Sequence, residues 1–389
     1  MWFFSSPQIV FGEQALSYLE RLSGARAAIV TDANLVRLGM VERIRRALAP
    51  TGMEILVIDQ VEPDPSLETV RQGAARLCEF APQWIIALGG GSVMDAAKAM
   101  WILYERPDIE PEAINPIEPL GLRAKARLAA IPTTTGTGSE ATWAIVLTDH
   151  AERRKLGLGS REALPDLAIL DPEIVAELPA RLTADTGLDA LTHAVEGFTS
   201  TFHNDFSDGL CLQAAKLVFE HLPVCFRDGA DLEARGHLQN AATLAGLGFG
   251  NSMAALAHGM GHALGAVFHT PHGRAVSLFL PYTIEYCARD QDTPTRYAPL
   301  AHFLGLPGED EAQAAASLAR AVRELQDAVG QPRTLAALGL TMMEFESELD
   351  LLVTNAMNDS QTVMSTRIPD EYDLRRLFQA AFSGSSIGF

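Results

Sequence analysis

The sequence predicts a two-domain fold, with an α/β parallel-sheet domain over residues 1–180 and an all-α domain over residues 181–389. A chain of 389 residues is too long for one ordinary core. In its first half, short apolar runs alternate with amphipathic stretches, which is typical of a parallel sheet with helical crossovers. Beyond Pro179 the strand-like runs stop and long Ala- and Leu-rich helical patterns take over.

Five apolar runs in the first domain are typical of buried strands. They lie at Ala27–Thr31, Glu54–Asp59, Trp84–Leu88, Leu128–Pro132 and Leu167–Leu170. Amphipathic segments between some of these runs predict helices over Leu67–Phe80 and Val93–Tyr104. The proline-rich stretch Pro107–Arg123 indicates an irregular connection.

The second domain is expected to begin near Leu182, with Thr183 as a helix N-cap. Asp310 and Thr341 also fit as N-caps, and Gly330 fits just past a helix C-terminus. The patterns predict helices over Asp185–Ser200, Phe206–Leu222, Leu232–Leu247, Asp310–Val329 and Thr341–Asn355.

Charge and cysteine usage exclude several classes of protein. The net charge is −19 and no block of Lys or Arg occurs, which disfavours nucleic acid and anionic membranes as partners. The four cysteines are widely spaced and form no CxxC, which indicates reduced thiols. The N-terminus lacks the features of a signal peptide, and no apolar run reaches the roughly 18–20 residues of a membrane span. We therefore expect a soluble cytoplasmic protein.

Two glycine-containing loops follow consecutive predicted strands. The first is G-G-G-S at 89–92, and the second is T-T-T-G-T-G-S at 133–139. Glycines let a backbone approach a diphosphate, and free N–H groups at a helix start donate to the anion. Each loop alone is equally well explained as a tight turn between a strand and a helix. Two of them at neighbouring strand ends favour a phosphate ligand, because ligands collect at the carboxyl ends of parallel strands.

Asp32 follows the first predicted strand. An acidic residue there can accept hydrogen bonds from a ribose hydroxyl and repel a 2′-phosphate, which favours NAD over NADP. An Asp that opens a turn or caps a helix is an equally common explanation of the same position.

Histidines gather in two places in the second domain. Asp189 and His193 stand four residues apart in a helical segment, so both project from one helix face. Four of the ten histidines fall between residues 258 and 272, and His258 and His262 repeat the four-residue spacing. His272 lies in a Pro-His-Gly sequence that indicates a turn. A single histidine on such a face is usually a core residue, but three imidazoles and one carboxylate suit a divalent metal ion.

Spacing leaves open which histidine is not a ligand. A catalytic ion keeps one position for water or substrate, so not all of His258, His262, His269 and His272 can bind it together with Asp189 and His193. His269 also fits an ordinary surface position. If cofactor and metal meet between the domains, the ion would polarise a carbonyl or lower the pKa of an alcohol while the nicotinamide exchanges hydride.

Four segments occur in one order along the chain: G-G-G-S-V-M-D-A-A-K, I-P-T-T-T-G-T-G-S-E, G-L-D-A-L-T-H-A-V-E and H-G-M-G-H-A-L-G-A-V-F-H-T-P-H-G. Together they resemble the iron-containing (group III) alcohol dehydrogenase family, and the resemblance extends over nearly the whole chain. It implies a dehydroquinate synthase-like fold, with an NAD-binding α/β domain and a helical metal-binding domain, in a homodimer or larger assembly.

The resemblance also implies roles for individual residues. The metal-ligand positions are matched by Asp189, His193, His258 and His272. His262 matches a non-ligand histidine beside the nicotinamide, a candidate for proton relay. The remaining matches concern the cofactor: Gly90, Gly91, Ser92 and Asp95 in the pyrophosphate loop, Thr133, Thr134 and Thr137 in the second loop, and Asp32, Asp64 and Lys155 near the adenosine ribose or the nicotinamide half.

Two departures from the family pattern stand out. Asp64 occupies a position where the family often has the asparagine of P-N-P. Ser365–Pro369 (S-T-R-I-P) stands where the family often has N-P-R beside the substrate cleft, which affects the assignment of substrate more than that of mechanism.

The sequence thus predicts an NAD-dependent, metal-dependent alcohol dehydrogenase acting on a small alcohol or aldehyde. The metal expected from the family is Fe²⁺, although the same ligands suit Zn²⁺. One alternative is a sister enzyme acting on an oxo- or hydroxy-acid, of the maleylacetate reductase or transhydrogenase type. A lyase of the dehydroquinate synthase type needs several basic residues for a phosphorylated substrate, and none gather around these histidines. A third alternative is a non-catalytic protein that binds NAD or metal.

Overall fold

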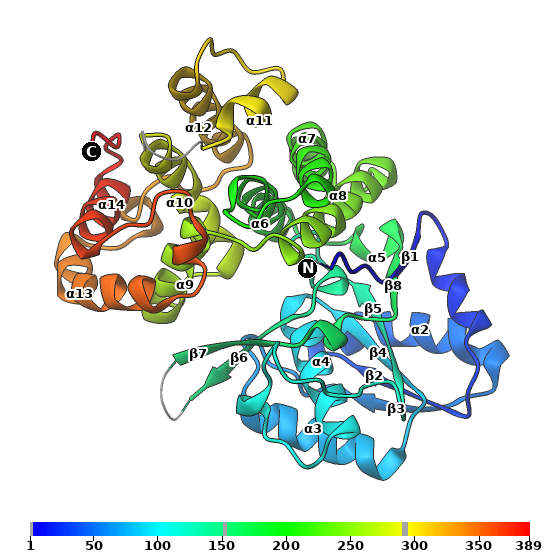
Figure 1. Cartoon of the computed structure of the whole chain (residues 1–389). Helices are drawn as coiled ribbons and strands as arrows, with labels where there is room; N and C mark the ends of the chain where they lie inside the picture. The colour runs from blue at the N-terminus through cyan, green and yellow to red at the C-terminus, as the bar shows by residue number, and fades with distance from the viewer. Residues whose placement is uncertain (1–2, 151–153, 290–294) are drawn as a thin grey trace. The chain divides into compact units, whose positions relative to one another are not determined.

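The computed structural model describes residues 3–150, 154–289 and 295–389. The chain divides into two compact units, Met1–Leu178 and Pro179–Phe389. The first unit is built on a parallel sheet and the second is helical (Figure 1), which confirms the predicted fold class. The boundary predicted from sequence, at 180/181, lies slightly further along the chain than the boundary of the compact units.

The sheet of the first unit has six strands, all parallel, in the order β1-β8-β5-β4-β2-β3. All five strands expected from the sequence are present. Their bounds are β2 Arg26–Val30, β3 Glu54–Ile58, β4 Trp84–Gly89, β5 Arg127–Pro132 and β8 Leu167–Leu170. The sixth, β1 (Gln8–Phe11), was not predicted, because an edge strand with half-exposed residues lacks the continuous apolar run of a buried one.

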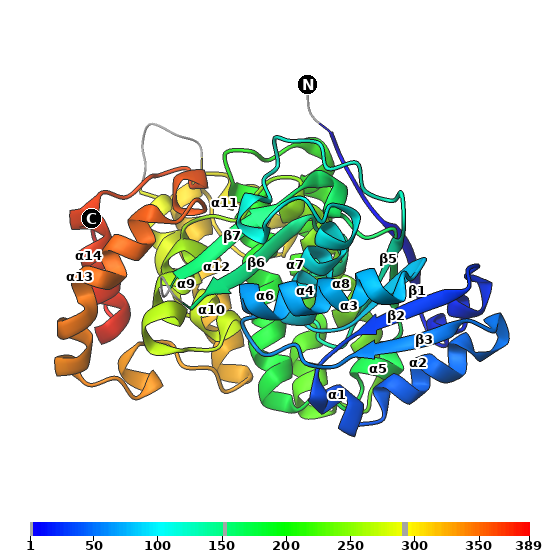
Figure 2. The same cartoon turned by 90° about the horizontal axis from the view of Figure 1, so that it is seen from below.

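Helices cover both faces of this sheet (Figure 2). Alternate residues of each strand point to opposite faces, so Ala28 and Ile85 pack with α3 (Leu67–Phe80) and α4 (Gly91–Glu105). Ala27 and Ile86, on the other face, pack with the remaining helices of the unit. These are η1 Ala15–Arg21, α2 Met40–Leu48 and α5 Pro172–Val175, while α1 Ala33–Arg37 lies after β2 and η2 Ala49–Thr51 after α2.

An antiparallel hairpin accompanies the main sheet and was not predicted. It pairs β6 (Ala144–Asp149) with β7 (Arg154–Gly159). The hairpin brings Lys155 opposite Thr148, and Thr148 in turn forms a bridge with Ser66 before α3. Pro107–Arg123 is irregular as expected, apart from the short η3 (Pro111–Ala113), and two more short 3₁₀ turns are η4 Ser139–Ala141 and η5 Arg161–Ala163.

The second unit is a bundle of helices around one apolar core. All five helices predicted there are present, with ends that differ by a few residues. The described helices are α6 Ala180–Thr199, α7 Asp205–Arg227, α8 Leu232–Gly250, α9 Leu256–Phe268, α10 His272–Cys287, α11 Tyr297–Phe303, α12 Glu311–Ala328, η6 Ala336–Leu338, α13 Met342–Asn358, η7 Thr362–Met364 and α14 Glu371–Ser383.

Caps explain where most of the predicted helices start. Asp310 and Thr341 accept hydrogen bonds from backbone N–H groups of α12 and α13, as predicted. Gly330 has the positive φ, 65°, expected just past a helix end. The expected N-cap at Thr183 is wrong, because its N–H already donates to the carbonyl of Pro179 inside α6.

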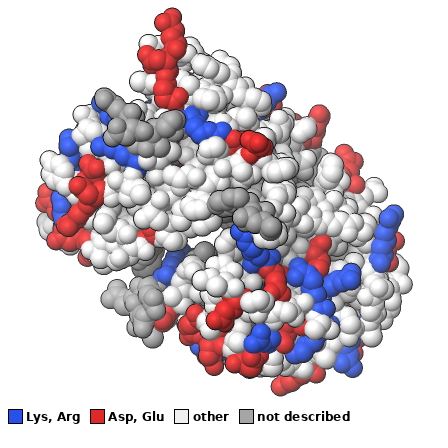
Figure 3. All heavy atoms as spheres, viewed as in Figure 1, with Lys and Arg blue, Asp and Glu red and all other residues white. Residues whose placement is uncertain are grey.

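One described helix, α7, is long and apolar enough to cross a membrane when judged by length and composition. It packs against α6 and α8, and its inward-facing residues Cys211, Ala214 and Val218 belong to the core. Core helices pass the same test of length and hydropathy, and we interpret α7 as one of them. On the face drawn in Figure 3, Lys and Arg side chains are interspersed with Asp and Glu rather than gathered in a block.

Candidate functional site

Three helices of the second unit bring the predicted metal ligands together. Asp189 and His193 lie one turn apart on α6, His258 lies in the first turn of α9, and His272 is the first residue of α10. The turn predicted around His272 is therefore wrong, since Pro271 is the N-cap of α10 and its carbonyl accepts the first helical hydrogen bond, from the N–H of Ala275 at 2.9 Å. One ligand atom of each of the four residues lies within 4.8 Å of those of the others.

The carboxylate of Asp189 is the centre of this cluster. Its Oδ1 lies 3.8 Å from His193 Nδ1, 3.9 Å from His258 Nε2 and 3.5 Å from His272 Nε2. Such separations are too long for hydrogen bonds, but they suit atoms that share one ion at about 2.0–2.2 Å.

The cluster fits a divalent cation on electrostatic grounds. Among the described residues, Asp189 Oδ1 and His258 Nε2 are buried polar atoms that have no hydrogen-bond partner. Burial raises the pKa of Asp189 to about 7; the charge of His258 acts against this shift, and the nearby carboxylates Asp185 and Glu196 act with it. A buried carboxylate oxygen without a hydrogen-bond donor is costly, whereas a cation between it and three imidazoles would compensate the charge.

Exposure differs among the four residues. The side chains of Asp189, His193 and His258 are at most 5% exposed, whereas that of His272 is 35% exposed. The cluster is therefore accessible from the side of His272. An ion bound there would have a side open toward solvent or a substrate, as a catalytic ion requires.

Packing at the start of α10 sets the position of His272. A Cβ atom on Gly273 would overlap the carbonyl oxygen of Asp185 on α6, so glycine lets the two helices approach closely. Arg274 makes a bidentate pair with the Asp185 carboxylate at 2.7 and 3.0 Å, and Gln331 donates to the same carboxylate at 2.8 Å. These contacts lock the N-terminus of α10 against the helix that carries Asp189.

His262 lies beside the cluster but outside it. Its ring centre is 5.3 Å from that of His272 and 5.8 Å from that of His258. His262 Nδ1 lies 2.7 Å from Asp359 Oδ2, just past the end of α13. Burial acts to raise the pKa of Asp359, but the hydrogen bond and charge of His262 outweigh it and hold the pKa below its usual value. His269 is exposed at the end of α9 and takes no part.

The two predicted phosphate loops of the first unit also meet. Gly89 and Pro132 pair across β4 and β5, so the loops that follow start side by side. Gly90 and Gly91 begin α4, and a Cβ atom on Gly91 would come 2.8 Å from the methyl group of Thr137. Glycine is required for this close approach of the backbone to the second loop. Thr133 continues the contact, its N–H donating to the carbonyl of Gly89 at 3.0 Å.

The predicted ribose and nicotinamide contacts fall into two places in the first unit. Asp32 caps α1, its Oδ1 accepting from the N–H groups of Asn34 and Leu35 at 2.7 and 3.1 Å. Asp64 instead joins Ser92 and Lys155. Its N–H donates to Ser92 Oγ at 3.3 Å, and its Oδ1 accepts from Lys155 Nζ at 2.7 Å.

Asp95 is already fully engaged within the protein. Its Oδ1 accepts from Ser139 Oγ at 2.7 Å and its Oδ2 from the N–H of Val146 at 2.9 Å. The ammonium of Lys98, which sequence reasoning missed, lies 3.8 Å from Asp95 and donates to Ser139 Oγ at 2.7 Å. Burial lowers the pKa of Lys98 to about 8, although Asp95 and Glu140 act to raise it. This arrangement suits a residue that fixes the two loops against each other.

Two carboxylates beside the metal cluster were also missed. Glu196, at hydrogen-bond distance from His258, lies on the same helix three residues after His193, so the helical period held a signal for it. Asp359 is 97 residues from His262, and no local pattern could have linked them. The departure at Ser365–Pro369 lies nearby, because Ser365 Oγ accepts from the N–H of Leu256 at the start of α9.

Two family models match the chain, one in each of its two parts. Residues 6–172 match the family model described as iron-containing alcohol dehydrogenase, and residues 183–382 match the model of the C-terminal part of the Fe-containing alcohol dehydrogenase family.

Individual relatives are similar over almost the whole chain. The NADPH-dependent butanol dehydrogenase of Clostridium saccharobutylicum is 38% identical over 98% of both chains. The aldehyde-alcohol dehydrogenase 2 of Entamoeba histolytica is 37% identical over 98% of this chain, which spans 46% of that longer protein. The solved alcohol dehydrogenase of Oenococcus oeni has a TM-score of 0.91 and 31% identity, covering 98% of this chain and 100% of the other. The chain belongs to the iron-containing alcohol dehydrogenase family, and it is a metal-dependent alcohol oxidoreductase.

Proposed function

We propose that this chain interconverts small alcohols and aldehydes with NAD(H), using Fe²⁺ held by Asp189, His193, His258 and His272. The observation that carries the proposal is the cluster of four potential ligands around a buried, unpartnered carboxylate oxygen. When bound, the ion polarises the substrate oxygen and the nicotinamide exchanges hydride with the neighbouring carbon.

The chain's own residues bind the cofactor, fix the two loops that hold it, and transfer the proton of the alcohol. The N–H groups at the start of α4, with Gly90, Gly91 and Ser92, hold the diphosphate of the cofactor. Thr133, Thr134 and Thr137 add polar contacts from the second loop.

Asp95 fixes the geometry of the two loops through its bonds to Ser139 and Val146. Asp64 and Lys155 form one ion pair and contact the adenosine ribose or the nicotinamide half of the same cofactor.

His262 accepts the proton that the alcohol releases. Asp359 is an acceptor, so its contact with His262 Nδ1 favours the tautomer in which Nδ1 carries the hydrogen. His262 Nε2 is then free of that hydrogen and accepts a proton released by the alcohol, directly or through water and a ribose hydroxyl. His262 is 24% exposed on its side chain, which lets it pass the proton on to solvent.

The choice between NAD and NADP depends on Asp32. The relative from Clostridium saccharobutylicum is described as NADPH-dependent. In this chain the carboxylate of Asp32 follows β2 and would repel a 2′-phosphate, which supports NAD. We also propose a homodimer or larger assembly and a cytoplasmic location, which light scattering and cell fractionation test.

The first experiment is oxidation of NADH with a panel of small aldehydes, before and after chelation, followed by addition of Fe²⁺ or Zn²⁺. We expect activity to disappear with the metal and to return with Fe²⁺. Activity that survives complete removal of metal would contradict the proposed mechanism. Activity confined to oxo-acids would favour the sister enzymes, and NADH binding without turnover on either class would favour a non-catalytic role.

A further inference from the structure

Glu196 lies next to the metal cluster but outside it. It stands on α6 three residues after His193, and its side chain is 5% exposed. Three N–H groups converge on its carboxylate. Oε2 lies 2.5 Å from His258 Nδ1 and accepts from the N–H of Ala255 at 3.0 Å, while Oε1 accepts from the N–H of Ala257 at 2.5 Å.

These contacts determine which nitrogen of His258 carries hydrogen. A carboxylate that accepts from two backbone N–H groups is an acceptor for the imidazole as well, so His258 Nδ1 donates its hydrogen to Glu196. The other nitrogen, Nε2, then presents its lone pair on the side where Asp189 Oδ1 lies, 3.9 Å away. A metal ligand requires this neutral tautomer with a free lone pair.

Glu196 also anchors the helix that carries His258. The N-cap of α9 is Ala255, whose side chain offers no capping oxygen. The carboxylate of Glu196 takes this place for Ala255 and Ala257, and Ser365 serves Leu256. One side chain therefore fixes both the start of α9 and the ring orientation of His258 relative to α6.

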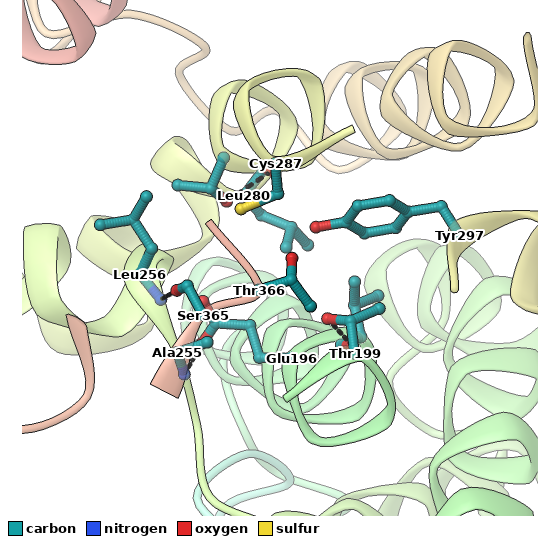
Figure 4. Close-up of a pocket in the computed structure, with 11 residues that line it drawn as sticks. Glu196, Thr199, Ala255, Leu256, Leu280, Cys287, Tyr297, Ser365 and Thr366 are labelled. Atoms are coloured by element: carbon teal, nitrogen blue, oxygen red, sulfur yellow. Dashed lines mark hydrogen bonds between the residues drawn. The ribbon is translucent and has the colours of Figure 1, made fainter. Parts of the chain in front are cut away.

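The surroundings of Glu196 leave little room for solvent. A cavity of about 10 Å³ adjoins it, lined also by Thr199, Cys287, Tyr297 and Thr366 (Figure 4). That volume is about the room of one water molecule, so bulk water does not screen the carboxylate. In such surroundings a charge-assisted hydrogen bond to an imidazole is strong.

We propose that Glu196 is the positioning residue of the metal centre, which holds His258 in the tautomer and orientation that bind the ion through Nε2. The proposal rests on the proposed function, since it presupposes a metal among Asp189, His193, His258 and His272. It assigns to Glu196 an effect on metal affinity that is separate from any contact with substrate.

The variant Glu196→Gln tests it with little change of shape. An amide has one acceptor oxygen, so its NH₂ group must face either Ala257 N–H or the pair formed by Ala255 N–H and His258 Nδ1. In both orientations the negative charge is lost, so the hydrogen bond that holds the imidazole is weakened or absent. We expect the Kd for Zn²⁺, measured by competition with a chelator, to rise about 10- to 100-fold. The Kd for NADH should be unchanged. An unchanged Kd for Zn²⁺ in folded Glu196→Gln would overturn the proposal.

Glu311→Gln is the matched control. Glu311 also accepts from N–H groups at a helix start, those of Tyr297 and Ala298 on α11, and from the hydroxyl of Thr295, but it holds no histidine. We expect this variant to lower thermal stability as Glu196→Gln does and to leave the Kd for Zn²⁺ unchanged. Equal weakening of metal binding in both variants would reduce Glu196 to a helix cap and contradict the proposal.

A measurement on the unaltered protein covers the case in which Glu196→Gln does not fold. Nitrogen-15 NMR of the Zn²⁺-loaded protein with labelled histidine should show His258 bound through Nε2, with a hydrogen on Nδ1 far downfield. Binding through Nδ1, or an Nδ1 without hydrogen, would overturn the proposal. Wild-type protein that binds no metal at all would instead contradict the proposed function.

Discussion

Two carboxylates, the buried Asp189 in the helical unit and the largely buried Asp95 in the α/β unit, are surrounded in opposite ways. Asp95 has a hydrogen-bond donor on each oxygen and the ammonium of Lys98 at 3.8 Å. Asp189 Oδ1 lies among three imidazoles at 3.5–3.9 Å and accepts no hydrogen bond from any described residue.

The contrast separates a structural charge from a binding charge. A buried charge with a structural role is compensated by donors and cations of its own chain, because an uncompensated one destabilises the protein. A charge that binds a ligand lacks such partners, and the bound ligand compensates it. Burial raises the pKa of both carboxyl groups, so the shift alone does not distinguish them, whereas the presence or absence of donors does.

The largest effect is expected for Asp189→Asn. Removal of this ligand should abolish retention of the ion, measured by metal analysis, and reduce turnover to the level of metal-free protein. Although function should be lost, the stability of the metal-free protein should increase. In metal-free protein the variant should be more stable than wild type, by about 1–3 kcal/mol in urea unfolding, because a buried charge whose Oδ1 has no hydrogen-bond donor is gone. Lower stability of the metal-free variant would show that the charge of Asp189 does not destabilise the empty site.

Asp95→Asn should lower the stability of the protein, with or without metal. The substitution leaves the buried ammonium of Lys98 without its carboxylate, which costs about 3 kcal/mol by analogy with broken buried pairs. Affinity for NADH should fall as the second loop loosens, while metal content stays at the wild-type level. Asp108→Asn is the control, since the exposed pair of Asp108 with Arg106 contributes little, and its stability should match wild type.

Asp359→Asn should have a smaller effect, and one confined to turnover. An amide no longer favours the His262 tautomer with hydrogen on Nδ1, so kcat should fall about 10- to 100-fold, part of what positioned proton transfer contributes. Metal content and the Kd for NADH should not change. Asp350→Asn on the exposed side of α13 is the control, and an equal loss of kcat there would remove Asp359 from the reaction.

The smallest effect is expected for Asp32→Ser. Serine keeps a capping oxygen for α1 and removes the charge, so the fold is preserved. The ratio of kcat/KM for NADPH to that for NADH should rise about tenfold, equivalent to about 1.4 kcal/mol. An unchanged ratio would leave Asp32 with the capping role alone, the alternative that the sequence left open.

Sequence reasoning succeeded where residues that act together are close in the chain or follow a period. The buried strands were predicted because they are continuous apolar runs. The spacing of Asp189 with His193 pointed to residues that the structure brings together with His258 and His272. The edge strand β1 and the hairpin of β6 and β7 were missed because half-exposed strands carry weaker patterns.

The partners of the site residues were harder to predict. Glu196 lies on the same helix as His193, and the helical period alone could have suggested it. The link between His262 and Asp359, and that between Leu256 and Ser365, depend on how distant helices pack. The first residues of α10 were predicted as a turn, because Pro-His-Gly is common in turns, whereas here Pro271 is the N-cap and His272 begins the helix.

The Oδ1 of Asp189, which has no hydrogen-bond donor among the described residues, has a consequence for the protein in a cell. Because the ion compensates its charge, the loaded chain is more stable than the empty one and opens less often. Proteases act on opened chains, so empty molecules are degraded faster than loaded ones. The abundance of this enzyme should therefore follow the supply of its metal even when its synthesis is constant.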